Sequence, residues 1–82
     1  MTDQPDTLLT QFVLAKLVKM LGEAQAHALA DEIFARVGAP QRQLQTPDQM
    51  KAVAVELIAR GGLLKMIGHS IMVEALLRGA KA

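Results

Sequence analysis

Apolar residues recur along the chain at spacings of three and four, and this pattern predicts four helices. Such spacing places side chains on one face of a helix, because one turn contains 3.6 residues. Glycine and proline divide the pattern at Gly22, Gly38, Pro40, Pro47, Gly61, Gly62 and Gly79. The predicted helices cover about residues 7–21, 23–37, 47–60 and 63–78. One continuous helix through Gly61 and Gly62 is the alternative for the last two, because each internal glycine costs only about 1 kcal/mol relative to alanine.

The third helix begins at the clearest local signal in the sequence. Thr46 is followed by proline, by an acidic residue and then by Gln49. This order is typical of a capping box, in which the threonine and glutamine side chains satisfy backbone N–H groups at the start of a helix. The residues just before it, 41–45, are polar apart from Leu44 and predict a surface loop.

The predicted helices are of two kinds. Residues 23–37 and 47–60 each carry one apolar stripe, which consists of Ala26, Leu29, Ala30, Ile33, Phe34 and Val37 in the first and of Met50, Val53, Ala54 and Leu57 in the second. Residues 7–21 and 63–78 are apolar on almost every side, which is typical of buried helices. The sequence therefore predicts an all-α fold: one compact four-helix domain over residues 1–82, with short connections and largely antiparallel neighbours.

A domain of this length cannot surround two of its own helices, because it buries only about 60–65% of the surface of its unfolded chain. A second copy can cover the last helix, the first helix or both, and we expect a homodimer through the last helix. The expected interface residues are Leu64, Met66, Ile67, Ile71, Met72, Val73, Leu76 and Leu77.

The last helix offers two apolar sides, one for the core and one for the partner. One side contains Met66, Val73 and Leu77, and the other contains Leu64, Ile71 and Ala75. The sequence does not decide which side faces inward. The small residues of this helix predict a close crossing with a neighbouring helix, at Gly68, Ser70 and Ala75.

Composition narrows the class of protein. With 51% hydrophobic and 21% charged residues the chain is expected to fold, and the lack of cysteine excludes disulfides, thiolate metal sites and a cysteine nucleophile. No apolar stretch reaches the roughly 20 residues of a membrane span. The first seven residues carry two acids and no base, the wrong polarity for a secretory signal. We therefore expect a cytoplasmic protein without a membrane segment.

The two histidines suggest little catalytic chemistry. Glu23, His27 and Asp31 follow one another at four-residue spacing, as metal ligands can on a helix, but no facing helix carries a matching set. His69 has no acidic residue within one turn to orient it, and the adjacent Ser70 points about 100° away. We expect no enzymatic activity, no cofactor and no metal. A pocket that brought either histidine near a carboxylate of another helix would favour an enzyme or a metal carrier.

Charge argues against nucleic-acid binding without excluding it. The net charge is only +1. A helix-turn-helix centred on residues 53–72 is the alternative, with Gly61 at the turn and Ile67 at a buried position. Ser70 falls where that motif requires an apolar residue, and the positions that should reach bases hold Leu63, Leu64 and Met66. A basic face would support this alternative if it gathered Lys51, Arg60, Lys65 and Arg78.

Helical spacing also predicts one ion pair between charged residues four positions apart. Glu56 and Arg60 are one turn apart and predict a pair on the third helix. Taken together, the patterns indicate a non-enzymatic protein–protein interaction or oligomerisation module. We expect a small cytosolic adaptor or regulator whose apolar helix surface binds a second copy of the chain or a helix of a partner protein.

Overall fold

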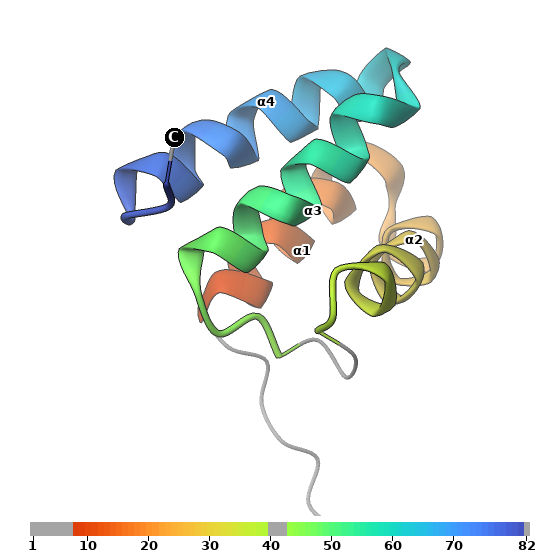
Figure 1. Cartoon of the computed structure of the whole chain (residues 1–82). Coiled ribbons are helices and arrows are strands. Elements are labelled where there is room, and N and C mark those ends of the chain that lie inside the picture. The colour runs from red at the N-terminus through yellow and green to blue at the C-terminus, as the bar shows by residue number, and fades with distance from the viewer. Residues whose placement is uncertain (1–7, 40–42, 82) are drawn as a thin grey trace, which may run out of the picture.

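The computed structural model describes residues 8–39 and 43–81, which contain four α-helices (Figure 1). Their bounds are Leu8–Leu21 for α1, Glu23–Arg36 for α2, Pro47–Arg60 for α3 and Gly62–Leu77 for α4. The prediction of an all-α, four-helix domain is confirmed, and each described helix end lies within one residue of its expected position. The expected first residue of α1, Thr7, lies outside the described residues.

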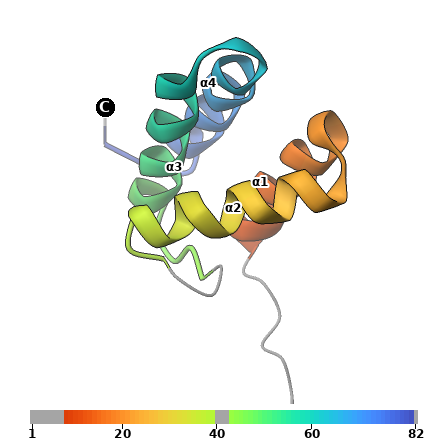
Figure 2. The same cartoon turned by 90° about the vertical axis from the view of Figure 1, so that its right-hand side faces the viewer.

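The helices form two hairpins that pack across each other (Figure 2). Gly22 joins α1 to α2, and Gly61 joins α3 to α4. Across the hairpins, α1 and α3 each contact all three other helices. The radius of gyration of 11.7 Å is that of a compact chain of this length, for which about 12 Å is expected.

The predicted capping box starts α3. The Thr46 hydroxyl accepts a hydrogen bond from the backbone N–H of Gln49 at 3.2 Å. In return, the Gln49 side-chain oxygen accepts from the backbone N–H groups of Thr46, at 3.4 Å, and of Gln45, at 2.7 Å. These bonds satisfy donors that the first turn of a helix leaves without partners, so the helix begins at a defined residue.

A sharp break separates α3 from α4. Gly61 has a φ of 75° and Gly62 a φ of 59°, in the left-handed region that residues with a Cβ rarely adopt. The backbone N–H of Gly61 donates to the carbonyl of Ile58, which closes the last turn of α3. The alternative of one continuous helix through the two glycines is therefore wrong.

The core lies where the two hairpins meet. The stripes of α2 and α3 supply its largest share, with Ala26, Ala30, Ile33, Phe34, Met50, Val53, Ala54 and Leu57 all buried, while Leu29 and Val37 are half-buried. The other two helices add Val13, Leu14, Leu17, Ile67, Ile71 and Ala75. The side of α4 that contains Ile71 and Ala75 therefore faces inward, a choice that the sequence left open.

The connection between the hairpins adds Ala39 and Leu44 to the core. Leu44, expected in a surface loop, is only 1% exposed, and its backbone N–H donates to the hydroxyl of the fully buried Thr10 at 3.1 Å. Leu44 is the apolar exception in this otherwise polar stretch, and its burial anchors the connection to α1. The other residues of that expected loop include Gln41 and Arg42, which lie outside the described residues.

Two ion pairs link α2 to α3. Arg36 Nε donates to Glu56 Oε1 at 3.1 Å, and Arg60 pairs with Glu32. The expected pair between Glu56 and Arg60 is wrong, because α2 offers each of these charges an opposite partner across the interface. The side chains are partly exposed, so each pair contributes only about 0.2–1 kcal/mol.

The closest approach of α3 and α4 is at Gly68. A Cβ atom there would lie 2.8 Å from Ile58 Cγ1 and 2.9 Å from both the Ala54 carbonyl oxygen and the Ile58 backbone nitrogen. The predicted close crossing is confirmed at Gly68 and agrees with the full burial of Ala75. Ser70 is exposed and points to a different neighbour, α1.

We expect Gly68→Ala to destabilise the protein although alanine is the better helix former. Helix propensity alone would add about 1 kcal/mol of stability. The new methyl group would meet backbone atoms of α3, and such overpacking typically costs about 1–3 kcal/mol. The measurement is urea unfolding followed by circular dichroism, with Ser70→Ala as the control on the exposed side of α4. A midpoint for Gly68→Ala above that of the wild type would contradict the close crossing.

Candidate protein-binding surfaces

The side of α4 that faces away from the core exposes five large apolar side chains. The exposed fractions are 53% for Leu63, 66% for Met66, 58% for Val73, 41% for Leu76 and 78% for Leu77. At 100° per residue they fall within one arc of about 140°. We call these five residues the outer face of α4. Single exposed apolar residues are common on proteins, whereas a group on one helix face is typical of a binding surface.

The structure divides the eight expected interface residues into three groups. Met66, Val73, Leu76 and Leu77 belong to the outer face. Leu64 and Met72 are half-buried, and Ile67 and Ile71 lie in the core of the single chain. Leu63 is exposed and was not among the eight. Sequence periodicity could not separate these groups, because α4 has apolar residues on almost every side.

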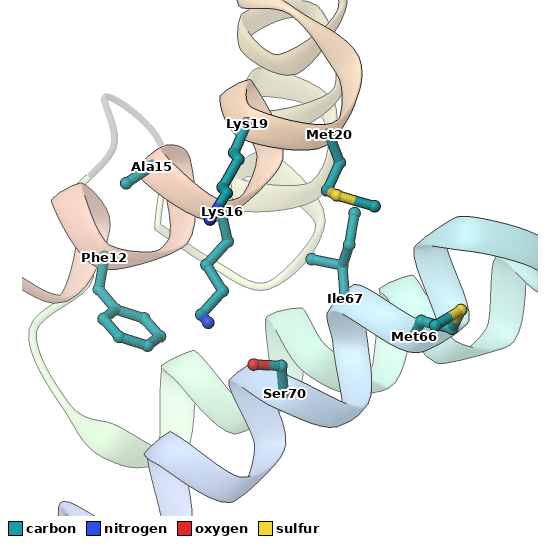
Figure 3. A pocket seen from close by; sticks show the side chains of 8 residues that line it. All are labelled: Phe12, Ala15, Lys16, Lys19, Met20, Met66, Ile67 and Ser70. Carbon is teal, nitrogen blue, oxygen red and sulfur yellow. The ribbon is translucent and has the colours of Figure 1, made fainter.

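A groove of about 460 Å³ opens between α1 and α4 (Figure 3). It is mainly apolar and is lined by Phe12, Ala15, Lys16, Lys19, Met20, Met66, Ile67 and Ser70. Phe12 and Lys16 extend from α1 toward α4, and Ser70 faces them from α4. Ile67 lies opposite Met20 at the other end. We call this feature the α1/α4 groove. Sequence reasoning missed it, because it depends on how two helices from opposite ends of the chain are placed.

Two cations flank the aromatic ring of the α1/α4 groove. Lys16 Nζ lies 5.2 Å from the centre of the Phe12 ring, and Arg78 Cζ lies 5.6 Å from it. Both distances suit cation–π attraction. Arg78 also donates to the Glu74 carboxylate at 2.8 Å, and this is an ion pair one turn apart on the chain.

The lysines of the α1/α4 groove have no carboxylate beside them. Helix α1 carries Lys16 and Lys19 and no acidic residue. Among residues 8–39 and 43–81, no ion pair involves Lys16 or Lys19. The acidic side chains of the four helices lie on α2 and α3, apart from Glu74. The groove is therefore a basic, apolar surface on a nearly neutral chain.

The basic residues that would favour DNA binding are largely engaged with partners. Arg60 and Arg78 form ion pairs, and Lys51 donates to the backbone carbonyl of Lys81. In addition, the turn at Gly61 is shorter than the three or four residues that join the helices of a helix-turn-helix. The geometry of this hairpin therefore does not favour the helix-turn-helix alternative.

The histidines lie apart on the two hairpins. His27 is half-buried on α2, where Glu23 and Asp31 are exposed, and His69 is exposed on α4. Within the described part of the chain, no three histidine or acidic side chains are placed to hold a metal ion. None of the described helices is both long enough and apolar enough to cross a membrane.

Comparison with known proteins assigns the chain to no group. No protein-family model, no curated protein and no solved structure matches it significantly. The features of the described residues that bear on function are therefore two surfaces, the outer face of α4 and the α1/α4 groove.

Proposed function

We propose that this chain is a non-enzymatic protein–protein interaction module, a small cytosolic adaptor or regulator that forms a homodimer through the outer face of α4. The observation that carries the proposal is the exposure of five large apolar side chains on this one helix. Complete burial of a fully exposed side chain of this size contributes about 1.5–3 kcal/mol, and these five, which are 41–78% exposed, would each gain a part of that amount if the face were covered.

A second copy of the chain is the simplest cover for this face. The five residues of the outer face are uncharged, so the surface can pack against itself about a two-fold axis without burying an unpaired charge. The nearest carboxylate on the helix, Glu74, is already paired with Arg78. The core residues of α4 lie on the opposite side, so packing at the outer face leaves the fold of each chain intact.

Sedimentation equilibrium of the purified wild-type chain tests the proposal. At micromolar concentration we expect the mass of two chains, falling toward that of one chain on dilution. A mass of one chain throughout the micromolar range would contradict the proposal, because the exposed outer face would then need no second copy.

A further inference from the structure

We propose that the α1/α4 groove binds an acidic amphipathic helix of another protein. This site shares Met66 with the outer face of α4, and its other lining residues lie outside the five that define that face. The proposal goes beyond self-association and does not depend on it, because most of the groove lining comes from α1 and the inner edge of α4.

The shape and lining of the α1/α4 groove suit a helix. Its α1 wall extends from Phe12 to Met20, about 12 Å along the helix axis, which matches about two turns of a partner helix, and its α4 wall extends from Met66 to Ser70. Phe12, Met20 and Met66 offer an aromatic ring and two flexible thioethers. Such side chains adapt to the apolar anchors of a partner helix, which recur at spacings of three and four.

The charge of the residues that line the groove determines which partner helices can bind there. Two lysines of α1, Lys16 and Lys19, line the groove. None of the residues that line the groove is acidic, and the described residues supply no carboxylate partner for these lysines. A partner with glutamate or aspartate beside its apolar anchors would therefore neutralise the rim, whereas a basic partner would be repelled.

A second copy of this chain does not fit the description of that partner. The acidic residues of the chain lie mainly on α2 and α3, where Val55 is the single large apolar residue that is strongly exposed among the described positions. Neither helix presents both acidic charge and a row of apolar anchors. Among the described helices α4 does carry apolar anchors, but its one acidic residue, Glu74, is paired with Arg78, so we assign the groove to a helix of a different protein.

The experiment uses the full chain with isotopically labelled methionine methyl groups and two synthetic peptides. Both peptides carry leucine anchors at helical spacing; one has glutamate at the remaining positions and the other has lysine. The chain contains five methionines, of which Met20 and Met66 line the groove and the fully buried Met50 serves as an internal control. We expect the acidic peptide to shift the NMR signals of Met20 and Met66 but not that of Met50, and the basic peptide to bind at least about tenfold more weakly.

Charge reversal on α1 supplies the matched control. The double variant Lys16→Glu with Lys19→Glu should weaken binding of the acidic peptide at least about tenfold and remove most of its dependence on salt. Lys51→Glu with Lys81→Glu changes the net charge equally, lies outside the groove lining and should leave binding unchanged. Equal binding of the two peptides, or equal effects of the two double variants, would overturn the proposal.

Two further outcomes identify other occupants and would also overturn the proposal. One is a shift of Met20 and Met66 on raising the concentration of the protein alone, which would indicate a second copy in the groove. The other is binding to phosphatidylglycerol vesicles without binding to the acidic peptide, which would indicate a lipid surface. Failure of the proposed homodimer can be told apart from failure of the groove proposal, because a monomeric Val73→Asp variant should still bind the acidic peptide.

Discussion

Replacing Ile71 with aspartate should abolish the fold of the single chain. Ile71 is fully buried in the core between the hairpins, where a carboxylate would lose water and find no partner. The cost of several kcal/mol is comparable with the whole stability of a small domain, about 5 kcal/mol at the lower end. Far-ultraviolet circular dichroism should show most of the helical signal lost without denaturant.

Two companion variants distinguish loss of the fold from loss of the dimer. Ile71→Ala removes packing without adding charge and should cost about 2–5 kcal/mol, seen as a lower urea midpoint with the helices retained. Val73→Asp places the same carboxylate two residues further along, on the exposed side of α4. A helical, stable Ile71→Asp protein would mean that α4 does not pack in the core as described.

The second large effect is expected at Val73. In the proposed dimer Val73→Asp places an unpaired charge in the interface of both copies, because a two-fold axis repeats the change. A penalty of about 3 kcal/mol or more corresponds to a dissociation constant at least about 100-fold higher. The helix content should remain close to that of the wild type, since Val73 is 58% exposed in the single chain. Sedimentation equilibrium and circular dichroism on the same sample measure both quantities.

Val55→Asp is the matched control for this prediction. Val55 lies on α3, is 49% exposed and belongs neither to the outer face of α4 nor to the α1/α4 groove. The same substitution at similar exposure should leave the dimer intact. Equal loss of association in the two variants would show that added charge weakens association wherever it is placed, and the outer face would lose its assigned role.

The helices with a single apolar stripe were predictable in detail from the sequence. The expected stripe of α3, from Met50 to Leu57, is fully buried, and that of α2 is buried apart from Leu29 and Val37. A helix with one apolar stripe can turn only that face toward the core, because only that face gains from burial. The capping box at Thr46 was equally predictable, since its residues are local in the sequence.

The inward face of α4 was not predictable, because apolar residues surround that helix. Its orientation depends on where the first hairpin lies, and that is a property of the assembled fold. The same limit applies to the α1/α4 groove, whose two walls come from opposite ends of the chain. The burial of Leu44 was not predictable, because a single apolar residue among polar neighbours has no periodicity. The ion pairs of Glu56 and Arg60 were not predictable either, because their partners lie on another helix.

The central claim is that a second copy packs on the outer face of α4, and isotope-filtered NMR of a mixed sample tests it most directly. Isotopically labelled and unlabelled chains are combined, so that contacts between copies are the only ones recorded. We predict contacts between chains at the methyl groups of Val73, Leu76 and Leu77, and none at the fully buried Val53 and Leu57 of α3. Contacts between chains that avoid α4, or no such contacts at concentrations where dimer is expected, would contradict the account.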